Sequence, residues 1–278
     1  MQIFSIDTGY FKLDGGAMFG VVPKTMWQKL NPPDENNLCT WAMRCLLIQD
    51  KDKLILIDSG IGNNITPQYQ QRYFTFGEDT LEKSLAKHGF STEDITDVIY
   101  THLHFDHCSG ALNRSDDGTL SLKFPNATYW TNNEHWNWAM EPNPREQASF
   151  LKENLNFLLN SNQLKFVDNE EWSFTNIEYE LMYGHTHAMM IFHIYKDDQT
   201  ISYCADLIPS HHHIKLPYIM AYDVQPLETL KEKHIFLEKA LENNHILVFE
   251  HDKDIEACTL KRTEKGIVFD KLISINEI

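Results

Sequence analysis

The pattern of apolar and polar positions along the chain predicts alternating strands and helices. Short apolar runs bounded by turn-forming residues are typical of buried strands, and they occur at residues 54–57, 98–100, 191–195, 200–204 and 246–249. Stretches with helical spacing lie at residues 143–160 and, more regularly, at 226–244. Because strands and helices alternate in both halves, we predict a layered α/β fold.

The segment 226–244 carries the clearest helical signals. Pro226 lies at the start and Asn243-Asn244 at the end, as expected of helix termini. One face of this helix would present Leu227, Leu230, His234, Leu237 and Leu241. Residues 30–38 are rich in Pro and Asn and predict a loop, and residues 114–118 predict a turn.

A chain of 278 residues lies at the upper end of what one hydrophobic core can organise. No repeat, low-complexity tract or linker forces a boundary. We therefore predict a single domain over residues 1–278, made of two halves at roughly 1–165 and 166–278.

Charge and cysteine content indicate which class of partner and which cellular compartment to expect. Lys and Arg total 24 against 40 Asp and Glu, which gives a net charge of −16 and disfavours a nucleic-acid partner. No apolar stretch approaches the about 18 residues of a membrane span, and the N-terminus lacks the pattern of a signal peptide. The five cysteines are scattered and without CxxC spacing. We expect a cytoplasmic protein that binds neither nucleic acid nor membrane.

A cluster of metal-ligand side chains follows the apolar run at 98–100. The segment THLHFDHCSG holds three imidazoles and one carboxylate within six residues, at His102, His104, Asp106 and His107. Burying four such groups without partners would cost several kcal/mol. Imidazole with carboxylate suits zinc, iron or manganese better than magnesium or calcium. The segment therefore predicts a metal site.

This segment resembles the HxHxDH motif of the metallo-β-lactamase superfamily, and further motifs follow in order. LILIDSG at 54–60 resembles the first motif of that family, YGHT at 183–186 its third, YCADL at 203–207 its fourth, and FEH at 249–251 its fifth. The resemblance covers most of the chain. It implies a four-layer αββα sandwich built from two βαβ-like halves.

The resemblance also implies a site with two divalent metal ions, zinc in the first place and iron or manganese otherwise. One ion would be bound by His102, His104 and His185, and the second by Asp106, His107 and His251. Asp206 would bridge the two, and Asp58 would orient a ligand histidine without touching metal. Asp106 and Asp206 would also take part in catalysis.

The chain departs from the family pattern at several positions. Many members read GHTPGH where this chain reads GHTHAM, so His187 is an alternative to His185, which we favour because it follows Gly184 directly. Asp206 rather than Cys204 fits the bridging position, which disfavours β-lactam hydrolysis. Pro209 replaces a Tyr that the lactone-cleaving members carry, although the chain looks most similar to the lactonase-like and organophosphate-hydrolase-like branch.

The function that follows is a binuclear metal-dependent hydrolase, in which a metal-bridging hydroxide cleaves a small ester, lactone or phosphoester. Two alternatives remain: a di-iron oxidoreductase on the same fold, and a metal-binding protein without turnover. The substrate, the acid that protonates the leaving group and the oligomeric state are not specified by the sequence. Homodimers are common among such relatives.

Other residues were open to two interpretations. The run His211-His212-His213 is expected to form a polar loop rather than a third metal site, with His213 or Tyr218 as candidates for lining a substrate pocket. Met18, Phe19 and Trp27 belong either to the core or to an apolar loop over the metals. Cys108 adjoins His107 but has no base partner, so a nucleophilic role is not expected.

Overall fold

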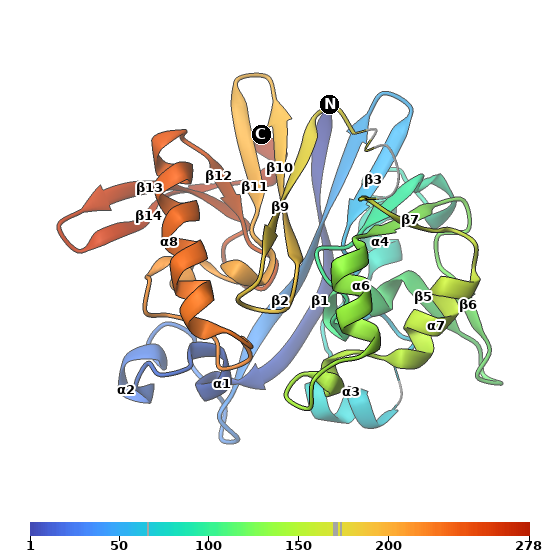
Figure 1. Ribbon diagram of the computed structural model, residues 1–278, viewed down its shortest axis with the longest axis horizontal. Helices are drawn as coiled ribbons and strands as arrows, with labels where there is room; N and C mark the ends of the chain where they lie inside the picture. The colour runs from blue at the N-terminus through green and yellow to red at the C-terminus, as the bar shows by residue number, and fades with distance from the viewer. Residues whose placement is uncertain (66, 169–171, 173) are drawn as a thin grey trace. The chain divides into compact units, whose positions relative to one another are not determined.

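The computed structural model divides the chain into two compact units and describes residues 1–65, 67–168, 172 and 174–278 (Figure 1). Unit 1 comprises Met1–Gly9 and Met43–Ser173, and unit 2 comprises Tyr10–Ala42 and Phe174–Ile278. The division lies near the expected halves, but Tyr10–Ala42 joins the C-terminal segment instead of the N-terminal one. That these units count as one domain stays a prediction.

Unit 1 is built on a sheet with the strand order β1-β2-β3-β4-β7-β8. Strands β3, β4, β7 and β8 are parallel neighbours, whereas β2 and β3 form an antiparallel pair. Leu85, Trp136 and Leu155 from its helices pack into the same core as the strand residues. The strands are β1 (Gln2–Asp14), β2 (Leu38–Asp50), β3 (Lys53–Ile57), β4 (Asp97–Ile99), β5 (Leu112–Arg114), β6 (Leu120–Leu122), β7 (Thr128–Thr131) and β8 (Leu164–Phe166); the helices are α3 (Pro67–Tyr73), α4 (Leu81–Lys87), α5 (Phe105–Cys108), α6 (Asn133–Met140) and α7 (Lys152–Asn160).

Unit 2 is built on a sheet with the strand order β14-β13-β12-β11-β10-β9, in which only the β11–β12 pair is parallel among the described strands. Figure 1 shows α8 alongside β13 and β14, which it contacts. The strands are β9 (Ile177–Met182), β10 (Met189–Lys196), β11 (Gln199–Tyr203), β12 (Ile246–Val248), β13 (Ala257–Thr263) and β14 (Gly266–Ile273); the helices are α1 (Gly15–Phe19), α2 (Lys24–Trp27) and α8 (Pro226–Glu242).

The strands expected from apolar runs all form, within a residue or two of the expected ends, as β3, β4, β10, β11 and β12. The expected turn at 114–118 connects the short strands β5 and β6. The helix expected over 143–160 is wrong in its first half. Only Lys152–Asn160 is α-helical, because Pro144 and the buried Phe150 lie in an irregular segment that precedes it.

The helix expected at 226–244 is confirmed as α8, but its buried face matches the expected apolar face only in part. Leu227 is 80% exposed and His234 is exposed, whereas Phe236, Leu237 and Lys233 are buried. The ammonium of Lys233 donates hydrogen bonds to backbone carbonyls, so a charged residue occupies a position that an apolar pattern assigns to solvent. Burial lowers the pKa of Lys233 to about 7.

The apolar residues near the N-terminus belong to the core of unit 2. Met18, Phe19 and Trp27 are each at most 2% exposed, and the rings of Phe19 and Trp27 stack at 5.4 Å. Their placement settles the choice between core and overhanging loop in favour of the core. Over the part of the chain that the structure describes, no helix combines the length and apolar character that a membrane span requires.

Candidate metal centre

Unit 1 brings Asp58 and the histidine motif together at the ends of two parallel strands. Asp58 directly follows β3, and Thr101 and His102 follow its neighbour β4. Side chains that follow parallel neighbours meet at one edge of a sheet, which is where open α/β sheets bind ligands. Asp58 has a φ of +57°, an uncommon conformation for a residue with a Cβ atom. The turn after β3 therefore holds the backbone of Asp58, which contacts the motif, in this uncommon conformation.

Asp58 organises two of the motif histidines through its carboxylate. Its Oδ1 accepts a hydrogen bond from the Thr101 backbone N–H at 2.8 Å, and its Oδ2 accepts one from the Thr101 hydroxyl at 2.7 Å. The same Oδ2 lies 3.2 Å from Nδ1 of His107. Because the Thr101 hydroxyl donates to Asp58, its oxygen can only accept from Nδ1 of His102, 3.0 Å away. Asp58 therefore sets the tautomer of His107 directly and that of His102 through Thr101.

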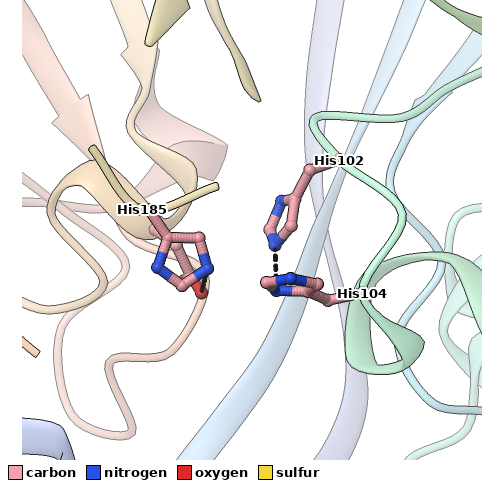
Figure 2. A group of neighbouring side chains, drawn as sticks. His102, His104 and His185 are labelled. Carbon is pink, nitrogen blue, oxygen red and sulfur yellow. Dashed lines mark hydrogen bonds and ion pairs between the residues drawn. The ribbon is translucent and has the colours of Figure 1, made fainter. Parts of the chain in front are cut away.

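His102 and His104 face each other in unit 1. Nε2 of His102 lies 3.1 Å from Nδ1 of His104, as the dashed line in Figure 2 marks. With the proton of His102 on Nδ1, its Nε2 offers a lone pair toward His104. The two ring nitrogens of His104 therefore have different neighbours. Nδ1 contacts His102, and Nε2 lies 3.5 Å from the carboxylate of the buried Glu146.

The short helix α5 places the remaining ligands of the motif. Its turn is closed by hydrogen bonds from the His107 and Cys108 backbone N–H groups to the His104 carbonyl. Nε2 of His107 lies 3.9 Å from Oδ2 of Asp106, and both side chains are buried. The four ligands that the sequence predicts in this segment therefore lie together in unit 1.

Gly110 allows the loop after Asp58 to pack against the segment after α5. A Cβ atom at Gly110 would lie 1.9 Å from the Ser59 carbonyl oxygen and 2.8 Å from its carbon, both rigid backbone atoms. We expect Gly110→Ala to lower the free energy of unfolding by about 3 kcal/mol, because this loop must shift to admit the methyl group. Urea denaturation of the variant measures the change.

Gly118→Ala is the matched control for this prediction. Gly118 has a positive φ of +87° but no atom within 4 Å of an added Cβ. Only the backbone conformation opposes that methyl group, so its cost should be about 1 kcal/mol. Equal losses of stability in the two variants would contradict the steric explanation for Gly110.

Unit 2 holds the other three predicted ligands. Asp206 lies in the short turn after β11, and His251 follows β12, which is the parallel neighbour of β11. His185 lies in the connection between β9 and β10. All three side chains are buried, and the sheet again brings residues far apart in the chain to the ends of neighbouring strands.

Asp206 lies between the two histidines of this unit. Its Oδ2 is 3.1 Å from Nε2 of His185, and its Oδ1 is 3.2 Å from Nε2 of His251. Each carboxylate oxygen thus faces a different imidazole. This is the arrangement required of a carboxylate that contributes one oxygen to each of two cations.

The other ring nitrogen of each histidine is already engaged. Nδ1 of His251 lies 2.8 Å from the Ala42 carbonyl oxygen, to which it must donate, and Nδ1 of His185 lies 2.9 Å from Oδ1 of Asp223. A neutral imidazole in this state carries its lone pair on Nε2. That lone pair faces a carboxylate oxygen of Asp206, a contact that only a proton or a cation between the two atoms makes favourable. The donor set therefore fits divalent metal ions that prefer imidazole and carboxylate.

Several supporting residues were missed by the sequence analysis. Asp223 orients His185, Thr101 orients His102, and the Ala42 carbonyl orients His251. Glu232 of α8 accepts hydrogen bonds from the backbone N–H groups of Tyr183 and Gly184 at 2.7 and 3.0 Å, and so fixes the turn before His185. Backbone carbonyls and distant carboxylates leave no local signal in a sequence.

The alternative histidines make different contacts in unit 2 from those of the predicted ligands. The ring of His187 packs edge-on against Tyr183 at 5.2 Å. His213 is buried, with Nδ1 at 2.8 Å from the Ser210 hydroxyl and Nε2 at 2.9 Å from the Met18 carbonyl oxygen. Both ring nitrogens of His213 are thus used in packing, and burial lowers its pKa to about 3. The expected polar loop at 211–213 is wrong at this residue, which is core.

Two further observations concern the motif segment of unit 1. Burial raises the pKa of the Cys108 thiol to about 12, which agrees with the expectation that it is not a nucleophile. An aromatic group adjoins the motif, because the rings of Tyr73 and Tyr69 lie 4.4 and 5.7 Å from that of Phe105. Burial, followed by the charge of Asp106, raises the pKa of Tyr73 to about 12.

Comparison with known proteins gives a family match over most of the chain. The sequence model of the metallo-beta-lactamase superfamily matches residues 44–251. That range contains Asp58 and every metal ligand that the motifs predict. No curated protein matches the chain.

Solved structures with similar folds span nearly all of the chain. A probable metal-dependent hydrolase from Staphylococcus aureus is 24% identical, with a TM-score of 0.85 and coverage of 98% of both chains. AidC, a dizinc quorum-quenching lactonase in complex with a product N-hexanoyl-L-homoserine, is 22% identical, with a TM-score of 0.77 and coverage of 98% and 95%. The hydrolase AbOPH is 18% identical, with a TM-score of 0.77 and coverage of 98% and 94%. Because these identities are low, the matches demonstrate similarity of fold alone.

Proposed function

The chain belongs to the metallo-beta-lactamase superfamily and has its α/β fold, and from this premise we propose that it is a binuclear metal-dependent hydrolase of small esters or lactones. Its metal ligands would be His102, His104 and His185 for one ion, and Asp106, His107 and His251 for the other. Asp206 would bridge the two. Zinc fits this donor set best, and iron or manganese would also fit.

The observation that carries this proposal is the state of the histidine rings. Nδ1 of His102, His107, His185 and His251 is engaged by an oxygen acceptor in each case. In each of these rings Nε2 is therefore the nitrogen left for coordination, which is the tautomer in which imidazole binds metal. In each of these four rings Nε2 lies toward another predicted ligand, whereas Nε2 of the core residue His213 contacts the Met18 carbonyl oxygen.

In the proposed reaction, the protein residues would hold two divalent ions and orient the reacting groups. The bound ions would supply a nucleophile at neutral pH by lowering the pKa of water to about 7. Asp206 would help to hold both ions and so to position that nucleophile. Asp106 would accept a hydrogen bond from it and keep it aimed at the scissile carbonyl. Asp58 and Asp223 would keep the histidine rings from rotating, so that little reorganisation accompanies the reaction.

The substrate would carry an apolar part. Tyr69, Tyr73 and Phe105 form an aromatic group directly beside Asp106, and aromatic surface next to reactive groups suits an acyl or aryl substituent. Lactonases and a hydrolase named AbOPH share the fold. Ester, lactone and phosphoester substrates should therefore be compared directly.

A hydrolysis panel tests the proposed function. The purified protein, with its metal content measured, is assayed against N-acyl homoserine lactones, aryl esters, thioesters, phosphotriesters and a β-lactam. We expect hydrolysis of lactones or aryl esters to exceed that of the β-lactam. The absence of hydrolysis of every substrate by protein that holds two metal ions would contradict the proposal and favour metal binding without turnover.

Asp223→Asn tests whether the orientation of His185 matters. An amide accepts the Nδ1 proton more weakly than a carboxylate and permits the opposite ring tautomer. We expect the affinity for metal to fall by about 10- to 100-fold, as is usual when a carboxylate partner of a metal-binding histidine is removed. Competition with a metallochromic chelator measures this affinity.

Asp254→Asn is the matched control, since Asp254 is exposed and pairs only with Lys253 through its side chain among the recorded contacts. It should bind metal with unchanged affinity. Unchanged affinity in Asp223→Asn as well would show that His185 needs no such partner.

A further inference from the structure

Unit 2 contains a cavity that shares no residue with the predicted metal ligands. Its volume is about 640 Å³, and its walls come from α2, the segment after His213, α8 and the β13–β14 hairpin. The apolar part of the lining includes Met26, Leu216, Leu237, Ile267 and Val268. This volume falls within the about 300–1,000 Å³ of typical small-molecule sites. The cavity therefore has the size and the apolar lining of a site for a small molecule rather than for a protein partner.

The rim of the cavity is cationic although the protein carries a net charge of −16. Lys215 and Lys265 both line it. Glu238 also lines it, but its carboxylate is paired with Arg262. Among the described residues, neither lysine ammonium has a recorded carboxylate partner, and Lys215 instead lies 5.2 Å from the Tyr218 ring. The rim thus offers positive charge that the protein itself does not neutralise.

One wall of the cavity is held in place by the buried Lys233 of α8. Its ammonium donates hydrogen bonds to the carbonyl oxygens of His213, Lys215 and Tyr218, at 3.1, 3.2 and 2.7 Å. These carbonyls bracket the segment that carries Leu216 and Lys215 to the cavity. Fixing the wall before binding removes the entropic cost of ordering it, which favours a ligand site over a mobile surface.

We propose that this cavity binds a single-chain amphiphile with a carboxylate head, such as a medium-chain fatty acid. The chain would lie against Leu216, Leu237 and Val268, where it removes apolar surface from water. The carboxylate would lie at the rim between Lys215 and Lys265, where a charge-assisted contact is available. The proposal does not depend on the hydrolase function, because no predicted metal ligand lines the cavity.

Calorimetric titration with sodium decanoate tests this proposal on the full-length protein as purified. We expect saturable one-site binding of decanoate, about 10-fold weaker binding of decanol and no saturable binding of decyltrimethylammonium. Amide shifts in an NMR titration should cluster at Leu216 and at Lys265 to Val268. Equal binding of all three amphiphiles, binding to anionic vesicles only, or no binding of decanoate would each overturn the proposal.

Matched variants locate the site. Val268→Asp places a carboxylate on the apolar wall and should abolish decanoate binding, whereas Leu272→Asp, exposed on the same strand and outside the lining, should leave it unchanged. Lys265 is exposed, so Lys265→Glu tests the rim without risk to folding and should weaken binding about 10-fold. His104→Ala should bind decanoate like the wild type. Loss of binding in His104→Ala, or wild-type binding by Lys265→Glu, would place the carboxylate elsewhere and overturn the proposal.

Discussion

Asp206→Asn is expected to lower kcat/KM by about 10³-fold, because it removes the residue proposed to bridge both metal ions and to position the nucleophile. The carboxylate presents one oxygen to His185 and the other to His251. An amide keeps the size of the side chain but replaces one oxygen with an N–H₂ group. That group donates to a histidine lone pair and so competes with metal. Steady-state kinetics on the best substrate of the panel, together with metal analysis, measure both effects.

Asp198→Asn is the control for this substitution, because Asp198 is exposed in the turn between β10 and β11. It makes the same chemical change on unit 2 and should retain full activity. We also expect Asp206→Asn to hold fewer than two metal ions per chain. An Asp206→Asn variant with wild-type kinetics and full metal content would refute the bridging role.

Removal of metal is expected to abolish hydrolysis completely. Dialysis against a strong chelator should reduce activity to the background rate, and two equivalents of zinc per chain should restore it. The metal-free protein should also be less stable. Metal held at 100 times its dissociation constant contributes about 2.7 kcal/mol to the folded state by mass action. Thermal unfolding with and without zinc measures this contribution.

Elemental analysis of the protein as purified distinguishes the competing chemistries. Zinc or manganese near two equivalents supports hydrolysis. Two irons that change oxidation state during turnover would support the di-iron oxidoreductase instead. Activity that persists after the metal content has fallen below one tenth of an equivalent would eliminate the metal-dependent mechanism.

The sequence predicted the strands well because apolar runs leave a local signal, and the histidine motif is equally local. Apolar runs of four residues became β3 and β12, and the residues after them, such as Asp58 and His251, occupy strand ends. His102, His104, Asp106 and His107 lie within six residues, so their proximity required little knowledge of the fold. The set of all seven ligands rests on the family resemblance and stays a prediction, as do the cytoplasmic location and the homodimer.

The features that escaped prediction depend on contacts between distant residues. The burial of Lys233 on α8 escaped the apolar pattern because its ammonium donates to carbonyls that lie more than ten residues away in the chain. The partner of His251 is a backbone carbonyl at Ala42, which no side-chain pattern encodes. His213 resembled a surface polar residue until its two hydrogen-bond partners were identified.

The interleaving of the two units constrains how the protein folds as it is synthesised. Unit 2 combines Tyr10–Ala42 with the segment from Phe174 to the end, so the first part of it leaves the ribosome long before the rest. Unit 1 is complete once its last strand and helix have emerged. Until the later segment of unit 2 has been translated, the apolar residues of the early segment have no partner segment that could bury them.

The early segment of unit 2 also determines when the predicted metal ligand His251 can take its final orientation in a nascent chain. Ala42 makes two backbone-level contacts with His251: its N–H donates to the His251 carbonyl at 3.2 Å, and its carbonyl accepts from the His251 ring. Ala42 precedes His251 by 209 residues in the chain. A ribosome-bound chain therefore lacks an oriented His251 until the segment that carries it has emerged.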